Sequence, residues 1–251
     1  MNESYNEFLS TWESQQNALI EMREQRFSFM MNVIENSHSK VDNILDVGCG
    51  PGSFTIRLAE RFPQARIYSI DYDPVLLRIA KNNVSKYGSR VRILEYDLKR
   101  NEWIHALDDE KFDAIVSTTA LHWIPKPNLK SLYKNFYTIL KSGGIFMDGD
   151  HFRSNNDSEY IQNLYSKIRD KISGDNLSRE EAMNWEQWWK YIADRGVFSE
   201  ELMERSRRYT SGSHDQNITL EEHIDILNRC GFDSVGIIWQ YLDNRVLFSR
   251  K

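Results

Sequence analysis

Short apolar runs alternate with amphipathic segments between residues 43 and 150. The apolar runs have the length of buried strands, and they are NILDV (43–47), RIYSID (66–71), VRILEYD (91–97), FDAIVSTTA (112–120) and IFMDGD (145–150). The segments between them have apolar residues at helical spacing, and we expect helices over 53–62, 74–88 and 128–144. Strands and helices that alternate at this pace predict parallel strands with right-handed crossovers, which is a doubly wound α/β fold.

The pattern is different on both sides of this alternation. Residues 4–36 predict one or two helices, and residues 155–217 are polar, aromatic and mostly helical in pattern, without a strand signal. A helix then begins at Thr219, which forms a capping-box pair with Glu222, and two apolar runs at 234–241 and 244–250 predict a hairpin. We therefore expect an N-terminal helical lid (1–38), an α/β domain (39–152 and 218–251) and a helical insertion or cap (153–217).

Composition and charge narrow the class of protein. With 251 residues, 40% hydrophobic and 27% charged, the chain has the composition of a soluble globular protein. The net charge of −5 gives no global basic field, which disfavours nucleic acid as a partner. The sequence has no signal-peptide pattern and no apolar run of about 18 residues, and Cys49 and Cys230 form no disulfide or zinc pattern. We expect a cytoplasmic protein that is not bound to a membrane.

The segment ILDVGCGPGSF (44–54) places three glycines directly after the first strand. A strand, a glycine loop and a helix form a turn that binds anions or nucleotides. Ser53 stands where the dinucleotide fingerprint has its third glycine, and the loop has no Gly-Lys pair of a P-loop. The loop therefore does not fit a pyrophosphate well.

Three acidic residues are associated with the ends of successive strands. Asp46 precedes the glycines, where a carboxylate repels phosphate and favours a cation. Asp71 ends the second strand, 19 residues after Gly52, at the position of a carboxylate that binds ribose hydroxyls. Asp97 ends the third strand. Because ligands of open α/β sheets bind outside the carboxyl ends of strands, we expect these acids to line one crevice that suits a cationic nucleoside.

The motifs LDVGCGPG, IYSIDYDP, ILEYDL and LKSGGIFM together resemble the successive motifs of class I S-adenosylmethionine-dependent methyltransferases. The resemblance covers about Asn43 to Gly149 and resumes at the C-terminal helix and hairpin. It implies a Rossmann-like, mostly parallel sheet of seven strands with the last strand antiparallel. It also implies S-adenosylmethionine as cofactor, with S-adenosylhomocysteine as product.

The resemblance also implies which residues hold the cofactor. The glycines would let the backbone approach the methionyl part, Asp71 would bind the ribose, Tyr72 would contact the adenine face, and Asp97 with Leu98 would reach the adenine edge. The predicted cofactor-binding residues are Asp46, Gly48, Cys49, Gly50, Gly52, Asp71, Tyr72, Asp97, Leu98 and Thr118.

Candidate catalytic residues follow the fourth and fifth strands. His122 lies in a Leu-His-Trp segment that resembles one found in many small-molecule methyltransferases. It either orients the substrate or accepts a proton, and the alternative is that it caps a helix. Asp150 and His151 are interpreted as a base or polarising pair, with a hydrogen-bonded turn as the alternative. We predict no metal site, because the metal-dependent branch of the superfamily also has an acid at the end of strand four, where this chain has none.

The candidate substrate-binding residues are Tyr5 and Trp12 of the N-terminal helical segment, Trp123 after the fourth strand, and His214 in a glycine loop before the returning helix. Trp185, Trp188 and Trp189 could form an aromatic wall, although their spacing is first of all a core-packing pattern. Arg205, Arg207 and Arg208 either meet an acidic substrate or form a solvated helix face.

The leading hypothesis is a methyltransferase that moves a methyl group to an oxygen, nitrogen or carbon of a small molecule by in-line displacement. Two alternatives remain at this stage. One is methylation of tRNA or protein, and the other is a non-catalytic protein that binds S-adenosylmethionine as a partner subunit. The sequence is compatible with a monomer or a homodimer.

Overall fold

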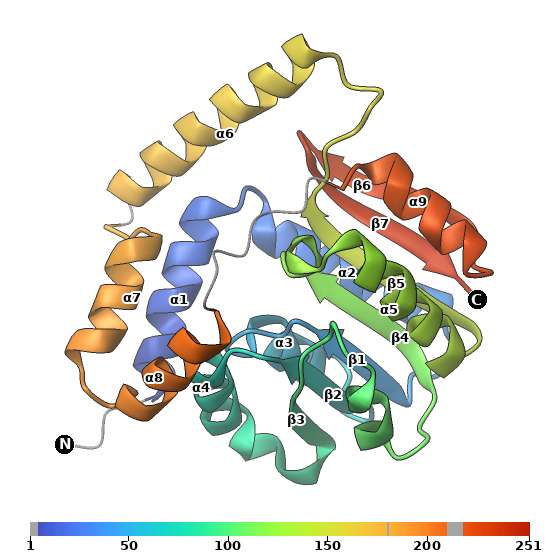
Figure 1. The fold of residues 1–251 in the computed structure, drawn as a ribbon, viewed down its shortest axis with the longest axis horizontal. Coiled ribbons are helices and arrows are strands. Elements are labelled where there is room, and N and C mark those ends of the chain that lie inside the picture. The colour runs from blue at the N-terminus through green and yellow to red at the C-terminus, as the bar shows by residue number, and fades with distance from the viewer. Residues whose placement is uncertain (1–4, 180, 210–217) are drawn as a thin grey trace.

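The computed structural model describes residues 5–179, 181–209 and 218–251. In these residues the strands form one sheet in the order β3-β2-β1-β4-β5-β7-β6 (Figure 1). The strands are β1 (Asn43–Val47), β2 (Arg66–Asp71), β3 (Val91–Glu95), β4 (Phe112–Thr118), β5 (Leu140–His151), β6 (Asp233–Tyr241) and β7 (Asn244–Arg250). The first five pair in parallel, and β7 runs antiparallel to both β5 and β6. The predicted seven-stranded Rossmann-like sheet is confirmed.

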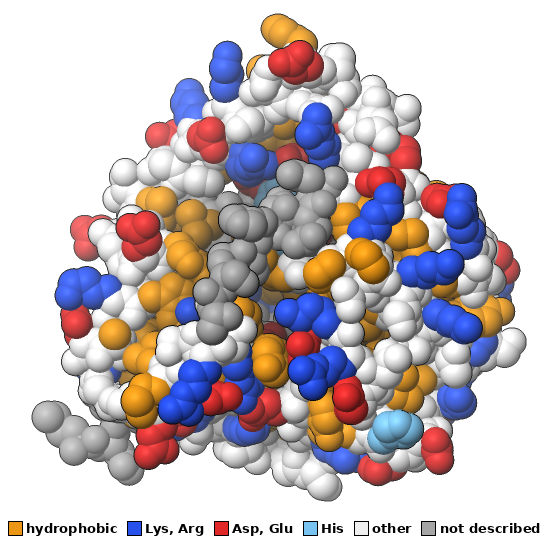
Figure 2. Space-filling model, in the orientation of Figure 1, with side chains coloured by type: hydrophobic (Ala, Val, Ile, Leu, Met, Phe, Trp, Pro, Cys, Tyr) orange, Lys and Arg blue, Asp and Glu red, His pale blue; other side chains and the backbone are white. Residues whose placement is uncertain are grey.

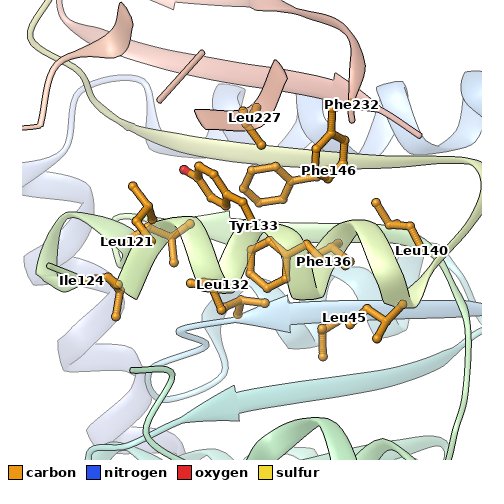
Figure 3. Packing of buried hydrophobic residues seen from close by; sticks show 14 of the residues in the cluster. Leu45, Leu121, Ile124, Leu132, Tyr133, Phe136, Leu140, Phe146, Leu227 and Phe232 are labelled. Atoms are coloured by element: carbon orange, nitrogen blue, oxygen red, sulfur yellow. The ribbon is translucent and has the colours of Figure 1, made fainter. Parts of the chain in front are cut away.

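Helices cover both faces of this sheet because its strands are apolar on both sides. On one face lie α5 (Lys126–Ile139), α9 (Leu220–Arg229) and a 3₁₀ turn (Glu102–Leu107), and on the other lie α2 (Arg23–Ser37) and α3 (Ser53–Arg61). Figure 3 shows the first core, in which aromatic side chains of α5 and β5 pack below α9. Burial of these side chains supplies the main driving force for the fold.

A third cluster joins the N-terminus to the insertion. Helix α1 (Tyr5–Leu19) packs against α4 (Pro74–Val84) and against α7 (Trp185–Asp194), with Trp188 fully buried among the side chains of α1. Helix α8 (Ser199–Arg208) adds Leu202, and Phe198 immediately precedes it. The N-terminal residues thus divide between two layers, since α1 packs with the insertion and α2 packs on the sheet (Figure 1).

Helix α6 (Glu159–Arg179) connects this cluster to the far edge of the sheet. The Ser173 hydroxyl donates to the Leu19 carbonyl of α1, and Arg169 Nη1 pairs with Asp243 in the β6–β7 turn at 2.5 Å. Figure 1 shows α6 as a straight helix that stands off the sheet, next to α1. Within the described part of the chain, no helix combines the length and apolar character that a membrane span needs.

The boundary between α5 and β5 differs from the sequence prediction. We predicted a helix to residue 144, but α5 ends at Ile139 and β5 begins at Leu140. Leu140 is buried and pairs with Phe112 of β4, so the sheet captures the segment that the helical pattern had included. Gly144 lies against the Phe112 carbonyl, where an added Cβ would be 3.0 Å from that oxygen.

The packing in Figure 3 predicts a large difference between two aromatic substitutions. Phe136→Ala empties a fully buried position of the α5 core and should lower the free energy of unfolding by about 3–5 kcal/mol. Tyr160→Ala, on a ring that is 77% exposed on α6, should change it by about 0.5 kcal/mol or less. Urea denaturation of both variants measures this, and equal losses would contradict the core described here.

Candidate active site

The glycine loop between β1 and α3 folds over the end of β2. All three of its glycines have positive φ, at 71° for Gly48, 54° for Gly50 and 92° for Gly52. The amides of Gly48 and Cys49 donate to the Ile70 carbonyl at 2.8 and 3.1 Å. These hydrogen bonds fix the path of the loop, and its left-handed backbone explains why glycine occupies these positions.

Gly48 also lies directly against the loop that follows β4. A Cβ built at Gly48 would be 2.2 Å from the Cβ of Ala120, so a side chain does not fit there. The contact brings the segment after Thr118, which ends β4, next to the glycine loop. His122 follows in the short 3₁₀ turn Leu121–Trp123, two residues after Ala120.

Asp71 is bound by backbone amides at the end of β2. Its Oδ2 accepts from the Gly50 amide at 2.7 Å, and its Oδ1 accepts from the amides of Tyr72 and Asp73 at 2.7 and 2.9 Å. Burial raises the pKa of this carboxyl above its usual value, although these three hydrogen bonds oppose the effect. The carboxyl therefore connects the glycine loop to the start of the next helix.

Asp46 lies deeper, on β1. Its Oδ2 accepts from the Thr55 hydroxyl at 2.6 Å, and that hydroxyl is 2.9 Å from the hydroxyl of Ser69. Burial raises the pKa of Asp46 to about 7, and the nearby charge of Asp71 adds to the shift. Two carboxyls that disfavour each other's ionisation in this way fit a ligand that brings positive charge, such as a sulfonium or an ammonium group.

The other predicted cofactor-binding residues lie around these two acids. Cys49 is buried, and burial raises the pKa of its thiol well above the usual value, which makes it an inert side chain of the loop. Asp97 accepts from the Lys99 amide at 3.0 Å just after β3, and Leu98 packs at the edge of the α5 core. Tyr72 is half-buried, beside Asp71.

His122 and Asp150 form a hydrogen-bonded pair at the ends of β4 and β5. His122 Nδ1 is 2.8 Å from Asp150 Oδ2, and the ring is 26% exposed while the carboxylate behind it is 5% exposed. Burial alone would raise the pKa of Asp150, but the neighbouring His122 lowers it below the usual value. An ionised Asp150 requires the proton of a neutral His122 ring to be on Nδ1, which puts the ring's lone pair on Nε2.

His151 has a different partner from the one that we predicted. Its ring Nε2 is 3.0 Å from Glu21 Oε2, and only its backbone amide donates to Asp150, at 2.8 Å. The reason is the alternation of a β-strand, which points the side chains of residues 150 and 151 to opposite faces of the sheet. The predicted pair of Asp150 with His151 is thus replaced by two pairs, Asp150 with His122 and Glu21 with His151.

Glu21, Arg26 and Asn244 were not predicted from the sequence. Arg26 is fully buried on α2, and its Nη1 donates to Asn244 Oδ1 at 2.7 Å, while the Asn244 amide donates to the Glu21 carbonyl. Burial lowers the pKa of Arg26 to about 10, which leaves it cationic at neutral pH near Asp148 and Asp150. No motif marks these residues, because they meet only when α2, β5 and β7 pack together.

Asp148 lies on the same strand face as Asp150, two residues deeper. It is fully buried, and burial together with the charge of Asp150 raises its pKa well above the usual value. We therefore interpret Asp148 as protonated and its neighbour Asp150 as ionised. In the described residues, no group of His, Cys, Asp and Glu side chains has an arrangement that could hold a metal ion.

The predicted substrate-binding residues lie in different places. The ring of Trp123 is 45% exposed and lies 4.8 Å from the ring of His122. Tyr5 accepts from Arg78 through its hydroxyl, and Trp12 packs on Trp188 at 4.8 Å, so both contribute to the packing of α1. His214 lies outside the described residues.

The raised pKa of Asp46 predicts how stability depends on pH. Between about pH 4 and pH 7 the folded state keeps a proton on Asp46 that the unfolded state releases, so this contribution to stability falls as pH rises. The free energy of unfolding of the wild type, relative to Asp46→Asn, should fall by roughly 2 kcal/mol from pH 5 to pH 7. Urea denaturation without added ligand measures it, and a difference that is constant with pH would contradict the assignment.

Comparisons with known proteins identify the kind of domain that this chain contains. Residues 44–144, from β1 to the start of β5, match the family model of a methyltransferase domain. A carboxy-S-adenosyl-L-methionine synthase of Nautilia profundicola is 22% identical over 94% of this chain and 88% of its own length. A trans-aconitate 2-methyltransferase of Enterobacter is 32% identical over 42% of this chain, and the match spans 37% of that enzyme.

Solved structures share the fold. An O-methyltransferase family protein of Burkholderia thailandensis has a TM-score of 0.57 and 12% identity, over 97% of this chain and 68% of the other. Human N-acetylserotonin methyltransferase, solved with S-adenosylmethionine, has a TM-score of 0.55 and 15% identity, over 97% of this chain and 57% of the human one. Residues 44–144 are therefore a methyltransferase domain, and the chain has the fold of the class I S-adenosylmethionine-dependent methyltransferases.

Proposed function

We propose that this enzyme transfers the methyl group to a small-molecule acceptor, with His122 as the general base. The observation that carries the proposal is the place of the His122–Asp150 pair. The contact between Gly48 and Ala120 holds the 3₁₀ turn of His122 beside the glycine loop. A base at this position lies next to the loop that approaches the methionyl part of the cofactor.

The residues that would hold the cofactor are those of the loop and the strand ends. The backbone at Gly48 to Gly52 allows close approach, Asp46 favours the positive charge, and Asp71 is placed for the ribose hydroxyls. Tyr72, Asp97 and Leu98 are the residues for adenine, and Cys49 and Thr118 complete the surroundings. When bound, S-adenosylmethionine supplies a methyl group on a sulfonium, whose transfer depends chiefly on the alignment of the acceptor.

His122 would accept the acceptor's proton through Nε2. The ionised Asp150 keeps the other ring proton on Nδ1 and stabilises the imidazolium that forms when Nε2 takes up a proton. This chemistry suits a hydroxyl, a protonated nitrogen or a carbon acid. Arg26, buried near Asp150, supports the ionised state of that carboxyl through its positive charge.

His151 and Glu21 would form a second polar wall of the acceptor site. In each pair a partly exposed imidazole lies in front of a buried carboxylate. The side chain of His151 is 24% exposed, and that of Glu21 is 2% exposed. Because the pairs stand on opposite sides of the end of β5, an acceptor lying across that end would contact both. We expect His151 to bind a second polar group of the acceptor rather than to take part in proton transfer.

The cap limits the size of the acceptor. Helices α1, α6, α7 and α8 of the chain itself stand above the carboxyl ends of the strands (Figure 1). We propose this set as the cap, with residues 39–152 and 218–251 as the catalytic domain. A covering made by the chain itself suits a small molecule better than a folded RNA or protein, and trans-aconitate is the small-molecule substrate named for one relative.

The proposal is tested with methyl-labelled S-adenosylmethionine and a cell extract separated into small-molecule, RNA and protein fractions. Label should enter the small-molecule fraction. His122→Gln and Asp150→Asn should each lower its maximal rate by about 10²- to 10⁴-fold, because the base or its orientation is lost. Calorimetry with S-adenosylhomocysteine should give an affinity close to that of the wild type for both variants.

His105→Gln is the matched control, because His105 is an exposed histidine of the 3₁₀ turn before β4 and should leave the rate unchanged. Label confined to RNA or protein would overturn the small-molecule acceptor. Full activity of His122→Gln would overturn the base while leaving the acceptor class intact.

A further inference from the structure

The basic run of α8 has two arginines that turn inward and one that does not. Arg207 is 75% exposed, and among the described residues its ion-pair partner is Glu204 on its own helix, at 3.5 Å. Arg205 and Arg208 instead reach residues of β2, β3 and the start of α4. Figure 2 shows basic and acidic side chains side by side over this part of the molecule, around α8 and α4.

Arg208 connects the ends of two strands. Its Nη1 donates to the Tyr72 carbonyl at 2.7 Å, after β2, and its Nη2 pairs with Glu95 at 2.7 Å, at the end of β3. The guanidinium also lies over the Tyr72 ring, 4.6 Å from its centre, and the side chain is only 14% exposed. The planar guanidinium suits such a combination of stacking and two directed hydrogen bonds.

Arg205 makes a second attachment next to the first. Its Nε pairs with Asp73 Oδ2 at 2.6 Å, and its guanidinium stacks on Trp189 of α7 at 3.8 Å from the ring centre. The other oxygen of Asp73 caps α4 by accepting from the amides of Val75 and Leu76. Arg205 thus joins α7 and α8 to the N-terminus of α4. Its partner there, Asp73, lies two residues after Asp71.

We propose that Arg208, with Arg205 beside it, positions the adenine of the cofactor and couples closure of the cap to cofactor binding. Arg208 holds Tyr72 against the end of β3, and so sets the width of the space between Tyr72 and the Asp97–Leu98 segment. The inference rests on the cofactor placement proposed above, and it does not depend on the identity of the acceptor.

The physical basis is a reciprocal coupling. If α8 completes the adenine site when it is attached to the strand ends, its attachment strengthens cofactor binding by some coupling free energy. Cofactor binding must then stabilise the attached position of α8 by the same free energy. The ion pairs are partly buried, so they are less screened by salt than pairs on the open surface. Closure of the cap and binding of the cofactor therefore favour each other.

The test uses calorimetry with S-adenosylhomocysteine. Arg208→Met keeps an apolar stem over Tyr72 but removes the hydrogen bonds to Tyr72 and Glu95, together with the ion pair to Glu204 on its own helix. It should weaken binding by about ten-fold. Arg207→Met, one residue away on the same helix, removes an exposed charge and should leave the affinity unchanged. Thermal unfolding of both variants without ligand establishes that they are folded.

Hydrogen exchange of residues 199–208 provides the second readout. S-adenosylhomocysteine should slow exchange of α8 in the wild type and in Arg207→Met, and this protection should be largely lost in Arg208→Met. A purely structural role of Arg208 would raise exchange of α8 equally with and without the ligand, and that result would overturn the coupling.

Asp71→Ala separates this inference from the cofactor placement on which it rests. If Asp71→Ala weakens binding by more than about ten-fold and Arg208→Met changes it by less than about two-fold, the role of Arg208 is wrong and the placement stands. If Asp71→Ala also leaves the affinity unchanged, the placement itself is wrong.

Discussion

No side chain fits at position 48, and the rest of the site depends on this constraint. A Cβ there would lie 2.2 Å from the Cβ of Ala120, so the loops that follow β1 and β4 are in direct contact. The contact places the His122 turn beside the glycine loop, and the loop in turn is held by Ile70 and Asp71 at the end of β2. Three strand ends are thereby assembled into one site by the close approach of two segments of backbone.

The acids around the site have different kinds of partner, and the difference corresponds to function. Asp150 and Glu21 pair with histidines, and Asp73 and Glu95 pair with arginines of α8. Among the described residues Asp46 and Asp71 have hydrogen bonds but no ion-pair partner, and burial raises the pKa of each. A cationic ligand provides the charge that this part of the site lacks, which agrees with the cofactor of the family.

Much of the catalytic domain was predictable because its signals are local. The apolar runs gave six of the strands within a few residues, and β5 was the exception because its pairing with β4 overrode the helical pattern before it. The position of Asp150 at a strand end also followed from the sequence. Its partner did not, because His122 is 28 residues away along the chain and their contact depends on the register of β4 and β5.

The residues that could not be predicted from the sequence are those that contact the site from helices packed against the sheet. Glu21 and Arg26 reach the site only because α2 packs on the sheet, and no spacing pattern connects them to His151 or Asp150. Arg205 and Arg208 had the pattern of a solvated helix face, and only the docking of α8 on the ends of β2 and β3 gives them partners. Long-range contacts of this kind leave no periodic signal in a single sequence.

A crystal structure with S-adenosylhomocysteine bound would test the central claim most directly. The account predicts the ribose hydroxyls on Asp71, the sulfur beside the loop at Gly48 to Gly52, and the rings of His122 and Trp123 facing the position that the methyl group would occupy. A nucleoside bound away from Asp71, or a sulfur on the opposite side of the sheet from His122, would contradict it.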